Sequence, residues 1–314
     1  LPLSCVLVRF EPLPPLSPSG ASAQQVPDQQ RPGWRMQLPR LVRLAKACKR
    51  RSHWLWLRVS ALLSTRSQAL LQAEFVPRES GRDLQTDRSV AIPLAWANKG
   101  EASVVRVAAV IHLYYDELAL EIRTYLESVE EGVDVYISTG NDYQAGLIRT
   151  AFSGWSKGSV DVRVVPNIGR DIAPKLVAFK DVYPRYEYVV LLHGKRSTHA
   201  SVLAPWRQFM LESLLGTPKI VASVLAIFDS QPKIGIVAAQ DFEPVRRWLG
   251  WGANFASSQL LAQRMGFSLD PQRPLDFPSG SMFWARSTGL KPLLDLELQF
   301  EDFDREQGQQ DGTL

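Results

Sequence analysis

One loop in the middle of the chain combines a glycine with two charged side chains. In the stretch PNIGRDIAP, residues 166–174, Gly169 is followed directly by Arg170 and Asp171. Glycine can adopt a left-handed backbone at little cost, which lets the two following side chains be aimed at a ligand. Asp171 also stands where it could serve only as the N-cap of the next helix. The spacing leaves both interpretations open, and we treat Gly169, Arg170 and Asp171 as candidate ligand-binding residues.

A second loop, HGKRST at residues 193–198, is rich in groups that bind phosphate oxygens. His193 is followed by a glycine, by the adjacent cations Lys195 and Arg196, and by two hydroxyls. Adjacent cations suit phosphate recognition, although a lone Lys-Arg pair is more often a solvated turn. The loop is not a Walker motif, and the chain has no G-x-G-x-x-G fingerprint with an acidic ribose ligand. Its position directly after an apolar run makes His193, Lys195 and Arg196 candidates for binding phosphate oxygens.

Two stretches near the C-terminus could complete a site. In FPSGSMFWAR, residues 277–286, Ser281 is followed by Phe283 and Trp284, a combination that lets a sugar ring approach the backbone closely. The same letters also fit a core strand with a glycine bulge. The acidic end, residues 301–311, could supply the carboxylate that a hydroxyl nucleophile needs as its base. No H-E-x-x-H or clustered His and Cys spacing occurs, so a catalytic metal is not indicated.

The elements that must position these loops alternate regularly from Val104 onward. Apolar, β-rich runs end just before each loop, and amphipathic runs with helical spacing follow. The predicted strands cover 104–114, 133–139, 160–167 and 186–195, and the predicted helices cover 116–129, 141–152 and 172–182. Such β-α-β spacing predicts an α/β fold with a mainly parallel sheet and helices on both faces. Ligands then bind at the carboxyl ends of the strands.

The N-terminal third differs from the rest in composition and charge. The 314 residues carry a net charge of +4, but residues 1–100 hold 15 Lys and Arg against six Asp and Glu. Residues 1–35 are rich in Pro, Ser and Gln and are predicted to be disordered. Residues 36–103 are predicted to form a basic amphipathic arm and a linker, and 104–314 a single domain. From 31 to 66 there are ten basic residues and no acidic one.

The basic segment 31–66 suits peripheral contact with an anionic membrane. A helix docked on its own domain fits equally well. Without interleaved aromatics or a nucleic-acid-binding fold, no nucleic acid partner is expected. The chain shows no signal peptide and no apolar run of the ~20 residues that cross a bilayer. With two cysteines only, we expect a cytoplasmic protein, placed peripherally on the inner face of the membrane if the arm binds lipid, with Met36 as a plausible start.

Six motifs in order resemble the rhamnan synthesis protein F family. They are VVRVAAVIHLYYDEL, PNIGRDIAP, YVVLLHGKRS, APWRQFMLESLLG, FPSGSMFWAR and GQQDGTL, within residues 104–314. The resemblance implies a GT-A-like glycosyltransferase of bacterial cell-wall or lipopolysaccharide assembly. It also implies dTDP-L-rhamnose as donor, a lipid-linked glycan as acceptor and no further cofactor. In that family the last motif runs on into another helix, so the domain is expected to be truncated at its C-terminus.

The resemblance also implies roles for particular residues. Many GT-A enzymes carry Asp-x-Asp for a divalent metal where this chain has His193 to Arg196, so Lys195 and Arg196 are expected to neutralise the leaving diphosphate without metal. Asp311 is the candidate base of an inverting transfer. Gly169, Arg170, Asp171 and His193 are the candidate donor-binding residues, together with Lys195 and Arg196. Ser281, Phe283 and Trp284 are the candidate acceptor-binding residues. The rival hypotheses are a non-catalytic carbohydrate-binding or scaffold protein of the same pathway and a transferase that uses another sugar donor.

Overall fold

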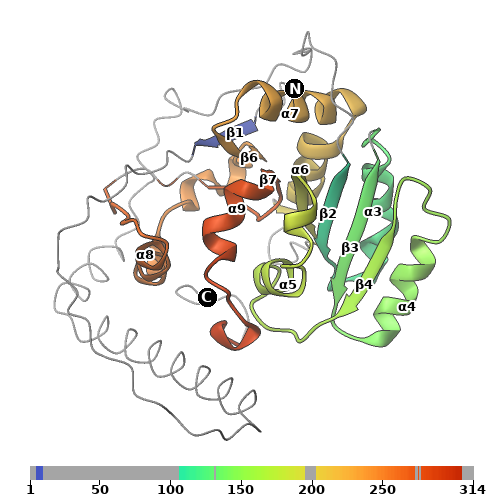
Figure 1. Cartoon of the computed structure of the whole chain (residues 1–314), viewed down its shortest axis with the longest axis horizontal. Coiled ribbons are helices and arrows are strands. Elements are labelled where there is room, and N and C mark those ends of the chain that lie inside the picture. Colours follow the sequence, from blue (N-terminus) through green and yellow to red (C-terminus); the bar gives the residue numbers. More distant parts are fainter. Residues whose placement is uncertain are drawn as a thin grey trace, which may run out of the picture. The chain divides into compact units, whose positions relative to one another are not determined.

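The computed structural model describes residues 5–9, 106–130, 132–194, 203–272, 275 and 277–305. Within these residues seven strands form one sheet in the order β1-β6-β7-β5-β2-β3-β4 (Figure 1). The strands are β1 (Cys5–Arg9), β2 (Val107–His112), β3 (Val133–Thr139), β4 (Val160–Val164), β5 (Tyr188–His193), β6 (Ile234–Ala239) and β7 (Phe283–Arg286). The α-helices are α3 (Ala119–Leu126), α4 (Asp142–Ala151), α5 (Ile172–Ala178), α6 (Trp206–Leu215), α7 (Pro218–Ser230), α8 (Phe255–Arg264) and α9 (Ser287–Leu294).

Strands β5, β2, β3 and β4 form the parallel half of the sheet. Every residue of β2, β3 and β5 is buried, which explains why β2 and β5 are near-continuous apolar runs in the sequence. Strand β3 also buries the polar residues Asp134, Ser138 and Thr139. Helices α3 and α4 supply the crossovers that parallel neighbours require. The predicted strands and helices up to His193 are confirmed, with boundaries that differ by a few residues.

The other half of the sheet is antiparallel, so the prediction of a mainly parallel sheet holds only in part. Strand β7 pairs antiparallel with both β5 and β6, and β1 pairs antiparallel with β6. Phe283, the first residue of β7, lies opposite Leu191 near the carboxyl end of β5. Because the chain enters β7 at the carboxyl edge of the sheet, this strand must run against β5. We refer to β7, β6 and β1 as the antiparallel half.

The N-terminal predictions fall mostly outside the described residues. Residues 5–9 form the edge strand β1, which the expectation of a disordered segment 1–35 did not include. The predicted basic arm and linker, 36–103, lie outside the described residues, as does the segment 31–66 that was predicted to contact a membrane. Among the described helices none is long and apolar enough by itself to cross a membrane. The pair α6 and α7 meets that test together, with a bend of 66° between them.

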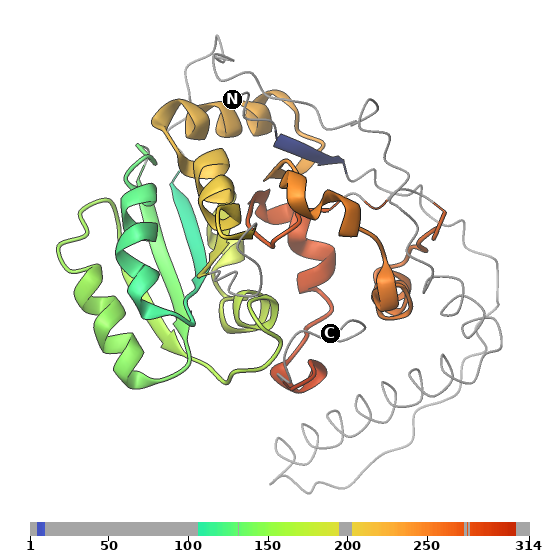
Figure 2. The same cartoon turned by 180° about the vertical axis from the view of Figure 1, so that it is seen from behind.

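Helices cover both faces of the sheet. Alternate residues of β2 point into two different clusters, with Ile111 on one side and Val110 on the other. The larger cluster contains buried side chains of α3, α4, α6 and α7, and the smaller one contains Leu290 of α9 and the segment after α5. In Figure 1, α5 and α9 lie in front of the sheet. In Figure 2, which views the molecule from behind, α3 and α4 lie in front of the sheet. The sheet is therefore the middle of three layers.

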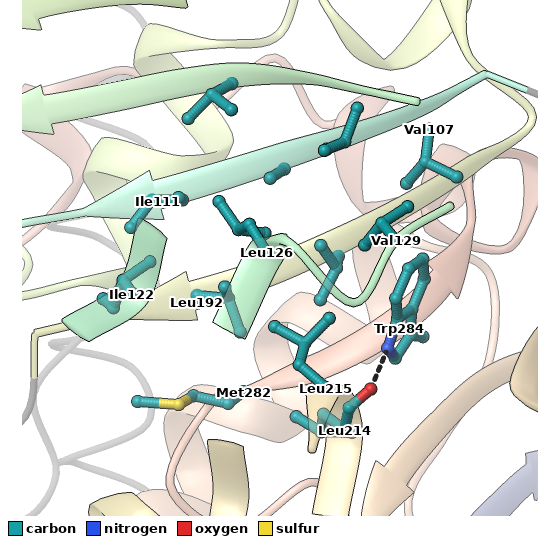
Figure 3. Close-up of a cluster of buried hydrophobic side chains, with 14 of the residues drawn as sticks. Val107, Ile111, Ile122, Leu126, Val129, Leu192, Leu214, Leu215, Met282 and Trp284 are labelled. Carbon is teal, nitrogen blue, oxygen red and sulfur yellow. Dashed lines mark hydrogen bonds between the residues drawn. The ribbon is translucent and has the colours of Figure 1, made fainter. Parts of the chain in front are cut away.

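Trp284 anchors the antiparallel half in the larger cluster. Its side chain is fully buried, and its indole N–H donates to the carbonyl of Leu214 at 3.0 Å (Figure 3). Met282 and Leu215 lie in the same cluster (Figure 3). A buried tryptophan needs such a partner for its N–H group, and Leu214 at the end of α6 provides it. This bond connects β7 to a helix that the sequence pattern alone did not place.

Candidate functional site

The carboxyl edge of the sheet brings the predicted loops together. His112 ends β2 and His193 ends β5, and the register places these two residues directly side by side. Both histidines are at least nine-tenths buried. Their strands are parallel neighbours, so their side chains leave the same face of the sheet. On that face lies α5, which follows the Gly169 loop.

The Gly169 loop makes a left-handed turn that presents Asp171. Gly169 and Arg170 both have positive φ, +67° and +53°. A Cβ on residue 169 would lie 2.5 Å from the Cβ of Ala173 and 2.8 Å from the ring of Phe303, so only glycine fits there. Asp171 occupies the N-cap position of α5 but makes no capping hydrogen bond. The interpretation of Asp171 as a helix cap alone therefore does not hold.

Asp171 instead pairs with a lysine one helical turn later. Lys175 donates from Nζ to Oδ2 of Asp171 at 2.6 Å, and the two side chains are 1% and 16% exposed. Lys175 was not among the predicted site residues. The i, i+4 spacing of an acid and a base on a helix was the signal that could have found it.

A second left-handed turn closes this group from the antiparallel half. Gly280 and Ser281 have φ of +84° and +57° and come just before β7. The carbonyl of Ser281 accepts a hydrogen bond from Lys175 Nζ at 2.8 Å, and the carbonyl of Gly280 lies 2.7 Å from Nε2 of His193. Because a carbonyl can only accept, Nε2 of His193 carries the proton of that bond. The turn is thus held by two buried donors.

The charges of the group act strongly on one another. Burial alone would raise the pKa of Asp171, but the neighbouring His193 and Lys175 hold it well below its usual range. Burial lowers the pKa of His112 to about 4, and its Nδ1 lies 3.0 Å from the hydroxyl of Ser138. At neutral pH the site therefore presents an ionised carboxylate, fixed by an ammonium, beside a neutral imidazole. Such a carboxylate is a strong hydrogen-bond acceptor and a weak base.

The structure brings together only some of the predicted site residues. Gly169, Asp171, His193 and Ser281 meet at the carboxyl edge, with Arg170 in the same turn. Three predicted residues lie outside the described part of the chain: Lys195, Arg196 and Asp311. No group of three or more His, Cys, Asp or Glu side chains arranged to hold a metal occurs in the described residues.

The expected acceptor residues of β7 need a correction. Trp284 is fully enclosed in the core and is not on a surface that an acceptor can reach. Trp284 therefore fits the alternative interpretation of this stretch as a core strand. Phe283 is half-buried and packs against the smaller cluster. Of the three, Ser281 is the residue whose backbone belongs to the buried group.

The chain belongs to a known family. The model of that family, rhamnan synthesis protein F, matches residues 87–314. This match begins 17 residues before the stretch on which the motifs were recognised. Family membership suggests a role in polysaccharide biosynthesis.

Two curated relatives match part of the chain. Uncharacterized protein WxcX from two strains of Xanthomonas campestris pv. campestris is 40% identical over 156 residues in each case. The match covers 49% of this chain and 22% of each relative, so the chain spans a small part of their length. No solved structure matches the chain.

Proposed function

We propose that this chain is a glycosyltransferase domain that transfers L-rhamnose from dTDP-L-rhamnose to a growing cell-wall or lipopolysaccharide glycan. The observation that carries the proposal is the buried group at the carboxyl edge, in a member of the rhamnan synthesis protein F family. Open α/β sheets bind their ligands at this edge. The proposed architecture is GT-A-like, with the donor over the parallel half and the acceptor over the turn at Ser281.

Asp171 has the properties of a group that binds a sugar hydroxyl. Its carboxylate is ionised and held by Lys175, so a donor hydroxyl can donate to its remaining lone pairs. A general base works best when its pKa lies near the operating pH, which excludes Asp171 from that role. We therefore assign Asp171 to donor positioning and keep Asp311 as the base.

The chemical step is a single displacement with inversion at the anomeric carbon. The acceptor hydroxyl attacks that carbon while its proton passes to the carboxylate of Asp311. The bond between the anomeric carbon and the diphosphate oxygen breaks, and dTDP leaves with the electron pair. Lys195 and Arg196 neutralise the charge that develops on the diphosphate, in place of a divalent metal. A β-linked donor then gives an α-linked product.

Two tyrosines replace Trp284 as candidate acceptor contacts. Tyr114 follows β2 and is 44% exposed, and Tyr143 in the first turn of α4 is 76% exposed. Gln144 donates from its side-chain amide to the carbonyl of Tyr114 at 2.8 Å, which ties the two segments together. Exposed tyrosines offer a flat apolar ring and a hydroxyl, both useful against a glycan. Loss of acceptor affinity without loss of donor affinity in Tyr143→Ala, with Leu120→Ala as control, would support this contact.

The experiment that tests the proposal is a donor panel with the purified protein. Calorimetry with dTDP-L-rhamnose, dTDP-glucose, UDP-glucose and dTDP should show preference for the first, and mass spectrometry should show sugar transfer to a lipid-linked glycan. Preference for another sugar nucleotide would leave a transferase with a different donor. Glycan binding without affinity for any nucleotide would favour the non-catalytic scaffold instead.

The assigned roles have their own tests. Lys195→Ala combined with Arg196→Ala should weaken donor binding, and Asp311→Asn should lower turnover with donor affinity kept. Unchanged donor affinity in the first variant, or activity abolished by EDTA, would contradict the metal-free step. Normal turnover in Asp311→Asn would remove that residue as the base. The protein is proposed to work at the cytoplasmic face of the membrane, and sedimentation with anionic vesicles would test contact through residues 31–66.

A further inference from the structure

Lys175 is a buried ammonium with hydrogen-bond acceptors in both halves of the sheet. Its side chain is 1% exposed, and its Nζ contacts Oδ2 of Asp171 at 2.6 Å and the carbonyl of Ser281 at 2.8 Å. Its own backbone carbonyl accepts from the hydroxyl of Tyr183 at 2.9 Å. Lysine is almost never fully buried without such partners, because desolvation of an unpaired ammonium is costly. The contacts explain why this lysine can occupy the interior.

The two acceptors belong to turns whose backbone is demanding. Asp171 follows two residues with left-handed φ, and Ser281 is itself left-handed and follows left-handed Gly280. Non-glycine residues in this region cost free energy unless their surroundings hold them there. Lys175 bonds to both turns, although 106 residues separate it from Ser281 along the chain. One side chain therefore connects the two segments proposed to face donor and acceptor.

We propose that Lys175 is a positioning residue, which keeps the Asp171 carboxylate charged and fixes it against the Ser281 turn. This inference deepens the proposed function and rests on it for the contact of Asp171 with the donor. Lys175 acts through Asp171 and Ser281, since both its acceptors are protein groups. Its replacement changes the protonation of Asp171 and the geometry of the turn, which a residue that only fills space would not do.

Titratable groups on neighbouring described elements face Asp171. They are Lys175 from α5, His193 from β5 and His112 from β2, and each acts to lower the pKa of the carboxyl. Burial acts in the opposite direction. Removing the ammonium therefore leaves a buried carboxyl with weaker compensation, and its pKa should rise. An opposite charge at this distance typically accounts for about 1–3 pH units.

The test compares Lys175→Met with Lys175→Arg, which keeps the charge, and with Lys291→Met. Lys291 makes a similar helical pair with Asp295 at 2.7 Å, but both side chains are more than half exposed. Carbon-13 NMR follows the titration of the Asp171 carboxyl, assigned by its loss in Asp171→Asn, and amide NMR follows Ser281. Calorimetry follows the affinity for dTDP-L-rhamnose between pH 5 and pH 8.

We expect Lys175→Met to raise the titration midpoint of Asp171 by about 1–3 pH units. The Ser281 amide should shift, and donor affinity should fall by about tenfold or more. Lys175→Arg should keep the midpoint low, and Lys291→Met should change neither measurement. An unmoved Asp171 midpoint together with an unmoved Ser281 amide would overturn the inference.

If Lys175→Met alone does not fold, the double variant Asp171→Asn with Lys175→Met removes both charges and should be tolerated better. Its donor affinity should then have the same pH dependence as Asp171→Asn alone, because Lys175 acts on protonation through Asp171. A different pH dependence would contradict this. The NMR titration needs no donor, so a wild-type protein that binds no sugar nucleotide would refute the proposed function while the role of Lys175 is still measured.

Discussion

The two halves of the sheet differ in how far apart along the chain their partners lie. In the parallel half, β2 reaches β3 through one short helix, and β3 reaches β4 in the same way, although β5 pairs with β2 from 81 residues further along the chain. In the antiparallel half, β7 inserts between β5 and β6 and pairs Arg286 with Tyr188, about a hundred residues earlier. The buried group lies where the halves meet, with Asp171 and Lys175 on one side and Gly280 and Ser281 on the other. Local sequence patterns therefore build most of one wall of the site, and long-range pairing builds the other and places β5 beside β2.

The strongest way to break this arrangement is to remove the anchor of β7. Trp284→Ala deletes a fully buried indole and its bond to Leu214, so the free energy of unfolding should fall by about 3–5 kcal/mol. Urea unfolding followed by circular dichroism measures the change. Leu120→Ala on the 60% exposed side chain of α3 is the control and should change stability by less than about 0.5 kcal/mol. Similar values for the two variants would show that β7 does not depend on this anchor.

The glycines of the two turns sharpen the comparison between the halves. Gly169→Ala forces a Cβ against Ala173 and the Phe303 ring at a positive φ, and should cost about 2–4 kcal/mol. At Gly280 the nearest atom is the sulfur of Met210, 2.5 Å away on a flexible side chain, so Gly280→Ala should cost less. Gly146→Ala in α4, where nothing lies within 4 Å, should stabilise by about 0.4–1 kcal/mol.

Thermal and urea unfolding of these three variants give the order directly. We expect Gly169→Ala to be the least stable variant, followed by Gly280→Ala, and Gly146→Ala to be more stable than the parent chain. A Gly280→Ala variant less stable than Gly169→Ala would mean that the antiparallel turn is the more rigid of the two.

The pH dependence of stability tests the burial of His112. The folded-state pKa is about 4, against an ordinary value of 6.5, so the unfolded chain takes up the proton first as the pH falls. The contribution of His112 to the free energy of unfolding is complete above pH 6.5 and is lost between pH 6.5 and pH 4. At pH 5 this loss amounts to about 2 kcal/mol. Urea unfolding at pH 7 and pH 5 measures the loss, and His112→Asn should reduce it. The same pH dependence in both proteins would show that His112 titrates normally.

The smallest effect is expected at the exposed pair of α9. Lys291→Met removes an ion pair of which both members are more than half exposed, and should change the unfolding free energy by less than about 0.5 kcal/mol. The buried pair of Asp171 and Lys175 has the same helical spacing and a different environment. Equal effects of Lys175→Met and Lys291→Met on unfolding would remove the distinction between them.

Much of the parallel half could be predicted from sequence because its signals are local. The run from Val133 to Thr139 is rich in β-branched and aromatic residues and bounded by turn residues, and α4 begins at an Asn141 cap that accepts from the backbone N–H of Gln144. The direction of β7 could not be predicted, because the sequence of this four-residue strand does not indicate which distant strand it pairs with. The pattern around Trp284 fitted a sugar-binding surface and a core strand equally well, and only its burial separates them.

The candidate site, like the fold, could be predicted from sequence only where its signals are local. Gly169 and Asp171 stand out because they lie shortly after a predicted strand, and His193 because it lies near the end of another. Lys175 was missed because a lysine inside a helix is usually exposed, and its burial depends on the carbonyl of Ser281 from the other half. His112 was noted at a strand end, but its place beside His193 follows from the pairing of β2 with β5.

The central claim is that the buried group at the junction of the two halves serves sugar transfer from a dTDP donor. The most direct measurement is the release of dTDP from dTDP-L-rhamnose by the purified chain in the presence of a lipid-linked glycan. We compare it with Asp171→Asn and, as a control, Asp295→Asn on the exposed surface of α9. We expect dTDP release by the parent chain and by Asp295→Asn. In Asp171→Asn the rate of dTDP release should fall by about a hundredfold. Equal release by all three proteins, or none by the parent chain, would contradict it.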